Sequence, residues 1–201
     1  MSLMNKLTTL SFTPRHTVLA NTSPFTARAQ IAALSNWGYD VRLQYTALGR
    51  ADYADVMAEA YAARFGETPV ALYDIDWTNR AGLGSAGTPV ANGAGQAGAQ
   101  FSVRGFPANT LVLNALDYLS IAYPARGANA RVLHQTVASV VSNGSGVATI
   151  PLLQPLRYAP ADGAAVNVVN PSGLFTITDY TQEADVNGYR TLTVSAVEYV
   201  P

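Results

Sequence analysis

The second half of the sequence is a succession of short apolar segments separated by turn residues. Two of the turns hold residue pairs that favour positive φ, Asn143-Gly144 and Asp162-Gly163. Such pairs are strong signals for tight hairpin turns. Strand-sized segments spaced roughly 8 to 14 residues apart, with turns between them, indicate an antiparallel sandwich or a small barrel. We expect strands at 101–106, 110–113, 118–123, 131–141, 147–153, 165–169, 174–179 and 191–199.

The first half holds an alternating segment and one amphipathic helix. Along residues 37–46, large apolar residues occupy every second position, which is typical of a half-buried strand; they are Tyr39, Val41, Leu43 and Tyr45. Residues 52–65 place apolar residues at helical spacing, in a stripe formed by Tyr53, Val56, Met57, Ala60 and Tyr61. Asp52 is suited to cap this helix, and Gly66 is suited to end it.

The elements around this helix leave two topologies open. Residues 1–36 are expected to form an arm with a strand or a helical turn, and residues 69–75 a further strand. A strand, a helix and a strand in this order are compatible with a parallel crossover unit, or with a helix packed on an antiparallel sheet. The strand pattern downstream favours the antiparallel sheet.

Residues 82–98 form a segment of low complexity. The segment contains six glycines and no charged residue. Such a composition does not build a core of its own. We therefore expect residues 82–100 to form a glycine-rich flexible loop, or an extension that becomes ordered against a partner.

The chain carries few charges for its length. Charged residues make up 12% of the sequence and the net charge is −1, whereas about 25% is usual in soluble proteins. The sequence has no basic stripe to hold a nucleic-acid backbone, so we do not expect sequence-specific nucleic-acid recognition. The low charge has two explanations: a surface that is covered in an assembly, or an alanine-rich coding bias.

The sequence also limits the redox chemistry and the membrane topology. It contains no cysteine, which excludes disulfides and thiolate metal sites. The first residues lack the pattern of a secretory signal, and no apolar run of about eighteen residues occurs. We therefore expect a protein that is made in the cytoplasm and does not span a membrane.

Two residue patterns suggest chemistry, and each has a simpler structural explanation. The segments 82–87 and 93–98 both match the dinucleotide pattern G-x-G-x-x-G, but neither lies between a strand and a helix. Asp74 and Asp76 are two residues apart at a strand end, where carboxylates can bind calcium or act as an acid-base pair on a sugar. No third carboxylate is near in sequence, so we favour a solvated strand end.

The remaining candidates are the histidines, a serine and the aromatic residues. His134 lies in an expected strand, His16 lies in the N-terminal arm, and neither accompanies a nucleophile motif. Ser145 is explained by the hairpin turn that contains it. The aromatic residues suit a core and a subunit interface, and alternatively a sugar-binding platform. We predict no catalytic, cofactor-binding or metal-binding residues, and no enzymatic activity.

Two stretches resemble tail proteins of long-tailed bacteriophages. In residues 37–76, the alternating strand leads into a short helix that ends in Phe65-Gly66 and is followed by the strand PVALYD, as in the N-terminal unit of tail-tip proteins. Residues 101–175 contain SVRGFPANTLVLNALDYLSI, SNGSGVATI, PLLQPLRYAPADGAAV and GLFTIT, and resemble a β-rich insert of minor tail proteins. Leu116 stands where the usual Ala-Gly-Asp pattern of that insert has its glycine.

The chain is thus similar to the distal tail protein family. The resemblance implies a mainly β fold, with an antiparallel β-sandwich, one packed α-helix and a barrel-like insert. The core sandwich would comprise residues 1–81, with helix 52–65, and the C-terminal strand 190–201. Residues 101–189 would form the β-rich insert or a second β-domain.

The resemblance also implies a structural function. Such proteins form homo-oligomeric, typically hexameric rings between the tail tube protein and the hub protein of the tip or baseplate. The expected location is the virion tail tip, after assembly in the host cytoplasm, with DNA passing through the ring lumen. The alternatives are another tail component (a hub, a tube adaptor or a neck protein) and a carbohydrate- or receptor-binding module.

Overall fold

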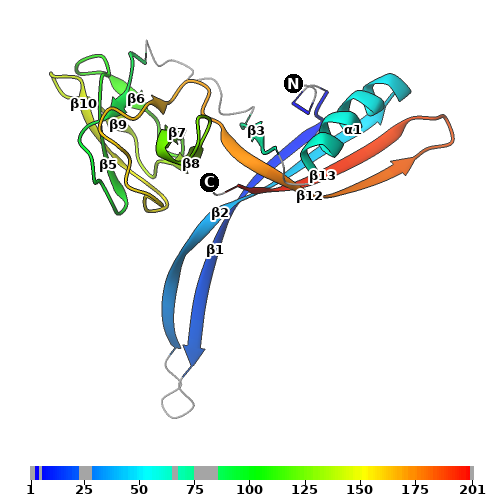
Figure 1. Ribbon diagram of the computed structural model, residues 1–201, viewed down its shortest axis with the longest axis horizontal. Helices are drawn as coiled ribbons and strands as arrows, with labels where there is room; N and C mark the ends of the chain where they lie inside the picture. The colour runs from blue at the N-terminus through cyan, green and yellow to red at the C-terminus, as the bar shows by residue number, and fades with distance from the viewer. Residues whose placement is uncertain (1–2, 5, 23–28, 65–67, 75–85, 200–201) are drawn as a thin grey trace. The chain divides into compact units, whose positions relative to one another are not determined.

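The computed structural model describes residues 3–4, 6–22, 29–64, 68–74 and 86–199; for 16–22, 29–36 and 64 it describes the backbone alone. The fold is mainly β with one α-helix, as the sequence predicts (Figure 1). The chain divides into two compact units. The first comprises Met1–Arg64 and Ile177–Glu198, and the second comprises Phe65–Thr176 and Tyr199–Pro201.

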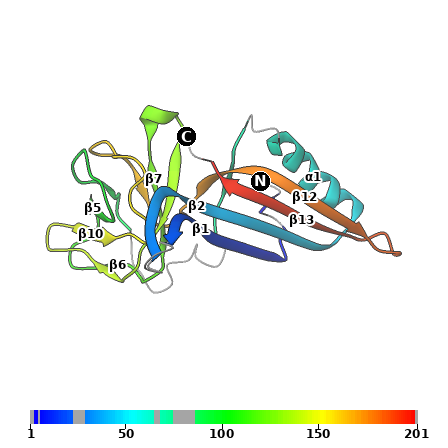
Figure 2. The same ribbon diagram turned by 90° about the horizontal axis from the view of Figure 1, so that it is seen from below.

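The first unit is built on an antiparallel sheet. Strands β1 (Thr9–Thr22), β2 (Ala29–Leu48), β13 (Arg190–Glu198) and β12 (Gly173–Ala184) are neighbours in this order. β1 pairs antiparallel with β2, and β2 pairs antiparallel with β13. Helix α1 (Arg50–Arg64) contacts β2 and β13 (Figure 2). In the described residues the layer over this sheet is the helix, where a second sheet of a sandwich was expected.

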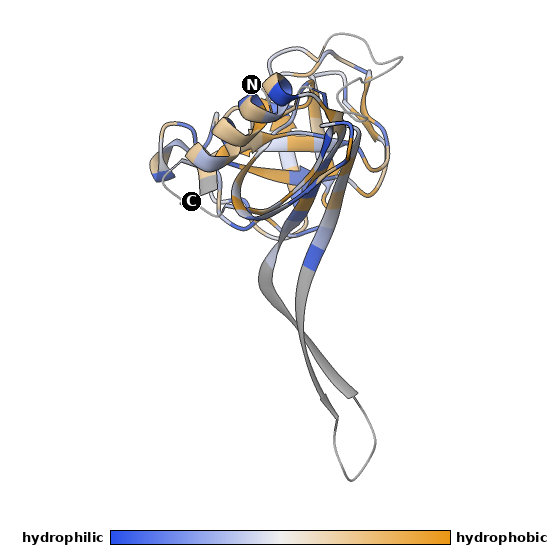
Figure 3. Cartoon of the chain, turned by 90° about the vertical axis from the view of Figure 1, so that its right-hand side faces the viewer, coloured by the Kyte–Doolittle hydropathy of each residue, from blue (hydrophilic) through white to orange (hydrophobic). Residues whose placement is uncertain are grey.

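The core of the first unit follows the predicted alternation. Tyr39, Val41, Leu43 and Tyr45 on β2 are almost fully buried, while Arg42 between them is exposed. Figure 3 shows both apolar and polar positions along the described strands, as expected for a sheet with one covered face. The helix contributes four buried side chains to this core, Val56, Met57, Ala60 and Ala63.

Helix α1 begins earlier than predicted. It starts at Arg50 instead of residue 52, and its first turn is closed by the Tyr53 amide, which donates to the Gly49 carbonyl at 2.9 Å. Asp52 therefore lies inside the first turn rather than at the cap, and it forms an ion pair with Lys6. The predicted stop, Gly66, lies outside the described residues.

The second unit contains ten short strands and one turn of 3-10 helix, η1 (Pro124–Arg126), in its described residues. The strands are β3 (Val70–Leu72), β4 (Val90–Ala91), β5 (Gln100–Arg104), β6 (Leu111–Leu113), β7 (Tyr118–Ala122), β8 (Arg131–Gln135), β9 (Val140–Val141), β10 (Val147–Pro151), β11 (Val166–Asn167) and the start of β12. β3 pairs antiparallel with residues 173–175 of β12, so the favoured antiparallel topology is confirmed.

Six of these strands form a closed circuit. The ladders join β4 to β5, β5 to β10, β8 to β7 and β7 to β11. Isolated bridges complete the circuit: Thr136 pairs with Leu152 next to β8 and β10, and Val90 pairs with Ala165 next to β11. The curled strands in Figure 1 thus form the barrel-like structure that the turn spacing indicates.

Both predicted turns are present, but in one of them the residue with positive φ differs from the predicted pair. Gly163 has a φ of 73°, as the Asp162-Gly163 pair predicts. In the other turn, the residue with positive φ is Gly146, at 71°, and not Asn143 or Gly144. Asn143 acts through its side chain, because its Oδ1 accepts hydrogen bonds from the amides of Ser145 and Val147 at 2.9 and 3.0 Å.

Leu116 preserves a turn for which glycine is better suited. Its φ is 69°, a conformation that costs an L-residue about 1–2 kcal/mol. Its amide donates to the Thr136 carbonyl at 2.9 Å, and its carbonyl accepts from Gln135 Nε2 at 2.9 Å. These two hydrogen bonds hold the turn in place despite the missing glycine.

The unit boundaries differ from the predicted ones. β3 belongs to the second unit, although it was expected in a core of residues 1–81, because it pairs with the start of β12. Residues 177–184 of β12 belong to the first unit, although they were expected in the insert 101–189. The expected strand 131–141 is divided into β8 and β9.

Candidate functional sites

The β1–β2 hairpin continues beyond the sheet of the first unit. The register between β2 and β13 ends where Asp40 pairs with Val197, whereas β1 and β2 remain paired as far as Thr22 and Ala29. We call residues 16–22 and 29–37 the outer ribbon. Among the described residues, the outer ribbon has no third strand beside it. Its two segments contain no Asp, Glu, Lys or Arg.

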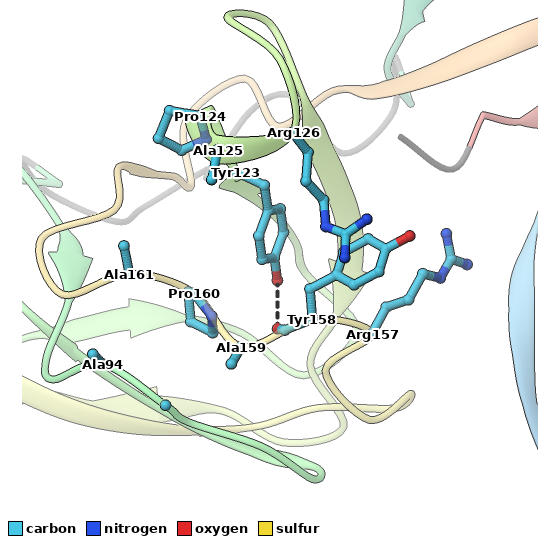
Figure 4. A pocket seen from close by; sticks show the side chains of 11 residues that line it. Ala94, Tyr123, Pro124, Ala125, Arg126, Arg157, Tyr158, Ala159, Pro160 and Ala161 are labelled. Atoms are coloured by element: carbon cyan, nitrogen blue, oxygen red, sulfur yellow. Dashed lines mark hydrogen bonds between the residues drawn. The ribbon is translucent and has the colours of Figure 1, made fainter.

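A cavity of about 610 Å³ lies beside η1 in the second unit (Figure 4). Three chain segments line it: residues 94–95, residues 123–126 and residues 157–161. All of the lining residues belong to the described chain, and they include two arginines, two tyrosines and no acidic residue. Figure 4 shows the arginines together with the Tyr158 ring on one side of Tyr123, and small apolar residues on the other.

Two tyrosines and an arginine organise the polar side of this cavity. The rings of Tyr123 and Tyr158 meet edge to face, with centroids 5.6 Å apart and planes at 78°. The guanidinium carbon of Arg126 lies 3.5 Å from the centroid of the Tyr158 ring, which is within the range of a cation–π contact. The Tyr123 hydroxyl donates to the Tyr158 carbonyl at 3.3 Å.

The Tyr123 phenol remains protonated at ordinary pH. Burial raises its pKa above the usual value, and Tyr158 raises it further, while the positive charges of Arg157 and Arg126 act in the opposite direction. The hydroxyl is therefore a stable donor to the Tyr158 carbonyl, and its oxygen can also accept a hydrogen bond.

The glycine-rich segment forms one wall of the cavity and is not the flexible loop that its composition predicts. Residues 82–85 lie outside the described part, but residues 86–98 contain β4 and a tightly bonded turn. Gln96 Nε2 donates to the carbonyls of Asn92, Gly93 and Ser102 at 3.0–3.2 Å, and Gln96 Oε1 accepts from the Ser102 amide at 2.6 Å. One side chain thus fixes the loop against β5.

An ion pair holds the same turn from the other side. Arg104 Nη1 donates to Asp162 Oδ1 at 2.6 Å, and the Gly93 amide donates to the same oxygen at 2.8 Å. These hydrogen bonds, that from Arg104 first, lower the pKa of Asp162 below its usual value. Residues 94 and 95 are consequently held in position at the cavity wall.

His134 is a core residue of β8. It is fully buried, and burial is the largest cause that lowers its pKa to about 3. The positive charge of Arg157 lowers the pKa further, whereas a backbone hydrogen bond involving Gln154 raises it. A neutral, enclosed imidazole agrees with the structural interpretation of this histidine.

The structure describes only some of the other residues that were weighed as candidates. Asp74 is half-buried and helps to raise the pKa of Tyr118 to about 12, after burial as the main cause, while Asp76 lies outside the described residues. Ser145 lies in its predicted turn. His16 lies in β1, with only its backbone described.

The glycine pattern 93–98 leads into β5 rather than a helix, so it lacks the helix start of a dinucleotide site; the pattern 82–87 lies mostly outside the described residues. In the described part of the chain, no three His, Cys, Asp or Glu residues are close enough together to hold a metal ion.

Sequence reasoning missed the cavity residues Tyr123, Arg126 and Tyr158. The available signal was the pairing of tyrosine with arginine in two separate segments, 123–126 and 157–158. These segments are more than thirty residues apart in sequence, and the contact of Tyr123 with Tyr158 arises only from the fold.

The described residues define a mainly β protein with one helix and two compact units. No helix in this part of the chain has the length and apolar character needed to cross a membrane. No protein-family model matches the sequence, and no curated protein matches it.

Proposed function

We propose that this chain is a structural subunit of a bacteriophage tail that assembles into a ring at the distal end, between the tail tube and the tip or baseplate hub. The proposed class of protein, a tail protein, is based on the resemblance of residues 37–76 and 101–175 to tail proteins. The observation that supports assembly into a ring is the outer ribbon, in which β1 and β2 stay paired beyond the end of the pairing between β2 and β13.

An isolated two-stranded ribbon is marginally stable in water, because it has too little apolar surface to bury. Proteins usually protect exposed edge strands with charged residues, and the outer ribbon contains none in its described segments. Nine residues of β strand span roughly 30 Å, which is enough to reach across a neighbouring subunit. A second copy of the chain is the partner that a ring of identical subunits would supply.

Exposed apolar side chains elsewhere also suit an assembled state. Val141, Leu116 and Val169 are exposed by 62%, 48% and 47%. A chain with a net charge of −1 has little electrostatic protection against association. The same near-neutral character would make a ring lumen weakly adhesive for passing DNA.

The oligomeric state tests the ring directly. We expect the purified chain to form a closed, hexameric ring, measured by light scattering coupled to size exclusion and by electron microscopy of the particles. A trimeric assembly would favour the hub alternative. A chain that stays monomeric at all accessible concentrations would contradict the proposal.

Shortening the hairpin tests the ribbon. Residues 17–36 are replaced by Asn-Gly, so that His16 and Trp37, which are paired in the register, close a two-residue turn. We expect this variant to keep its circular dichroism spectrum and its cooperative unfolding, and to lose the ring. A shortened protein that still forms rings would show that the outer ribbon is not the interface.

Point variants supply a matched control. Leu19 pairs with Ala32 and Ala20 with Ile31 within the outer ribbon, so L19K and I31K each introduce a charge into it. V186K introduces the same charge at an exposed turn residue. We expect the two ribbon variants to shift the protein towards monomer, and V186K to leave the ring intact.

A further inference from the structure

We propose that the cavity beside η1 binds an acidic saccharide, meaning a sugar unit that carries a carboxylate. This inference goes beyond the structural role proposed above and does not depend on it. It rests on the combination of an apolar wall, two tyrosines and two arginines that line one cavity of about 610 Å³.

The size and the apolar wall suit a sugar ring. Ligand cavities of roughly 300–1,000 Å³ are mostly apolar, with a few polar groups that orient the ligand. Here small side chains from residues 94, 125 and 159–161 lie on one side of Tyr123 (Figure 4). The C–H faces of a sugar ring pack against such surfaces and against aromatic rings.

The charge of the lining selects an acidic ligand. Arg126 and Arg157 both line the cavity, and the lining residues include no carboxylate. The contact of its guanidinium carbon with the Tyr158 ring, 3.5 Å from the centroid, holds the Arg126 side chain beside the cavity, and a guanidinium carries several N–H donors in one plane. The fork of N–H donors on a guanidinium suits the two oxygens of a carboxylate.

The Tyr123 hydroxyl supplies a polar contact for a sugar hydroxyl. The Tyr123 O–H group donates to the Tyr158 carbonyl. The Tyr123 oxygen can still accept a hydrogen bond from a ligand. A sugar hydroxyl can donate to this oxygen. An anion without an O–H group, such as sulfate, cannot use this contact, because its oxygens only accept hydrogen bonds.

The cavity is built before a ligand arrives. Gln96 and Asp162 fix the turn that holds residues 94 and 95, and the Tyr123–Tyr158 contact joins the other two segments. A preformed site loses little conformational entropy on binding.

The test is a titration of the full chain, followed by isothermal calorimetry and by chemical shifts in NMR spectra. Glucuronate is the probe, and glucose, which has the same ring without the carboxylate, is the matched ligand. We expect glucuronate to bind at least about tenfold more tightly than glucose, because a charged hydrogen bond is lost with the neutral sugar. Shift changes should centre on residues 123–126 and 157–158.

Variants separate this site from general charge effects. R126Q and R157Q should each weaken glucuronate binding by about tenfold. R42Q removes the same charge from an exposed residue of β2 in the first unit and should leave binding unchanged. The cavity variants should also retain the oligomeric state, so that a failure of sugar binding and a failure of ring assembly are distinguishable.

Three outcomes would overturn the proposal. The first is no binding of glucuronate at concentrations of tens of millimolar. The second is equal affinity for glucose and glucuronate, which would show that the carboxylate does not contribute to binding. The third is equal affinity for glucuronate and inorganic phosphate, which would reduce the cavity to a general anion site.

Discussion

Single residues of this protein are constrained most strongly where two backbone segments approach closely. At Gly146 an added Cβ would lie 2.2 Å from the Phe106 carbonyl oxygen, and the Phe106 amide donates to the Gly146 carbonyl at 3.1 Å. The turn therefore needs glycine for space as well as for its positive φ. Gly95 has nearly the same φ, 73° against 71°, but an added Cβ there would meet no atom within 4 Å.

Alanine variants at these two glycines separate the cost of a positive φ from the cost of the close backbone contact. We expect G95A to lower the free energy of unfolding by about 1 kcal/mol, which is the cost of a left-handed L-residue. G146A should lower it by at least about 3 kcal/mol, because the chain must also move the Phe106 carbonyl, and the Phe106 amide is held by its hydrogen bond to the Gly146 carbonyl. Urea unfolding of both variants measures the difference. Equal losses would show that the close approach relaxes without cost.

His134 makes stability depend on pH. Its pKa of about 3 in the folded protein is below the value of about 6.5 in an unfolded chain, so the unfolded chain binds the extra proton between these values. Its contribution to stability is therefore complete above about pH 6.5 and is lost as the pH falls towards 3. Between pH 7 and pH 5 the loss should be about 2 kcal/mol.

Urea unfolding at the two pH values tests this dependence, with H134L and H134Q as comparisons. Both variants lack the imidazole and should show a smaller difference between pH 7 and pH 5, even where they are less stable overall. A wild-type protein whose stability is the same at both pH values would contradict the assignment of a buried, neutral histidine.

At the scale of elements, the glycine-rich turn depends on one side chain. Gln96 makes four hydrogen bonds to the backbone of its own turn and of β5. Removing a half-buried partner leaves backbone groups without their hydrogen bonds, which costs about 1–3 kcal/mol. The order of residues 92–98 should therefore be lost before the rest of the second unit.

We expect Q96A to lower the free energy of unfolding by this amount and to accelerate hydrogen exchange of the Ser102 amide. Q100A removes the same side chain from an exposed position on β5 and should change stability by less than about 0.5 kcal/mol. If Q96A left the exchange of Ser102 unchanged, the turn would be held mainly by the ion pair of Arg104 with Asp162.

The same turn shows where sequence reasoning stops. The strands of the second unit were predictable because alternation and turn residues are local signals. The order of residues 92–98 was not, since it depends on Asp162, about seventy residues away, and on one glutamine in a segment of low complexity. The length of β2 was underestimated for a related reason: residues 29–36 lack alternation, and their strand structure comes from pairing with β1. The cavity residues meet only through the fold.

The whole molecule combines a low charge with an uncharged ribbon, which predicts how its assembly responds to salt. Raising the salt from about 0.1 to about 1 M shortens the Debye length from about 10 to about 3 Å, which removes most attraction between surface charges. An assembly held by the outer ribbon should survive this change, because backbone pairing and apolar contact are screened little. Light scattering at both salt concentrations tests the prediction. Dissociation at high salt would assign the interface to ion pairs instead.

The closed strand circuit of the second unit limits how further copies can add to an assembly by strand pairing. Its ladders and bridges pair β4, β5, β10, β8, β7 and β11 within one chain, so an incoming strand could add only next to the two isolated bridges or by displacing a neighbour. Outside the circuit, the described strands β1, β3, β6 and β9 each pair with a single neighbouring strand in their sheets. A ring forms where one surface of each copy contacts a different surface of the next and the rotation between copies completes a circle, whereas a rotation that does not close gives an open filament.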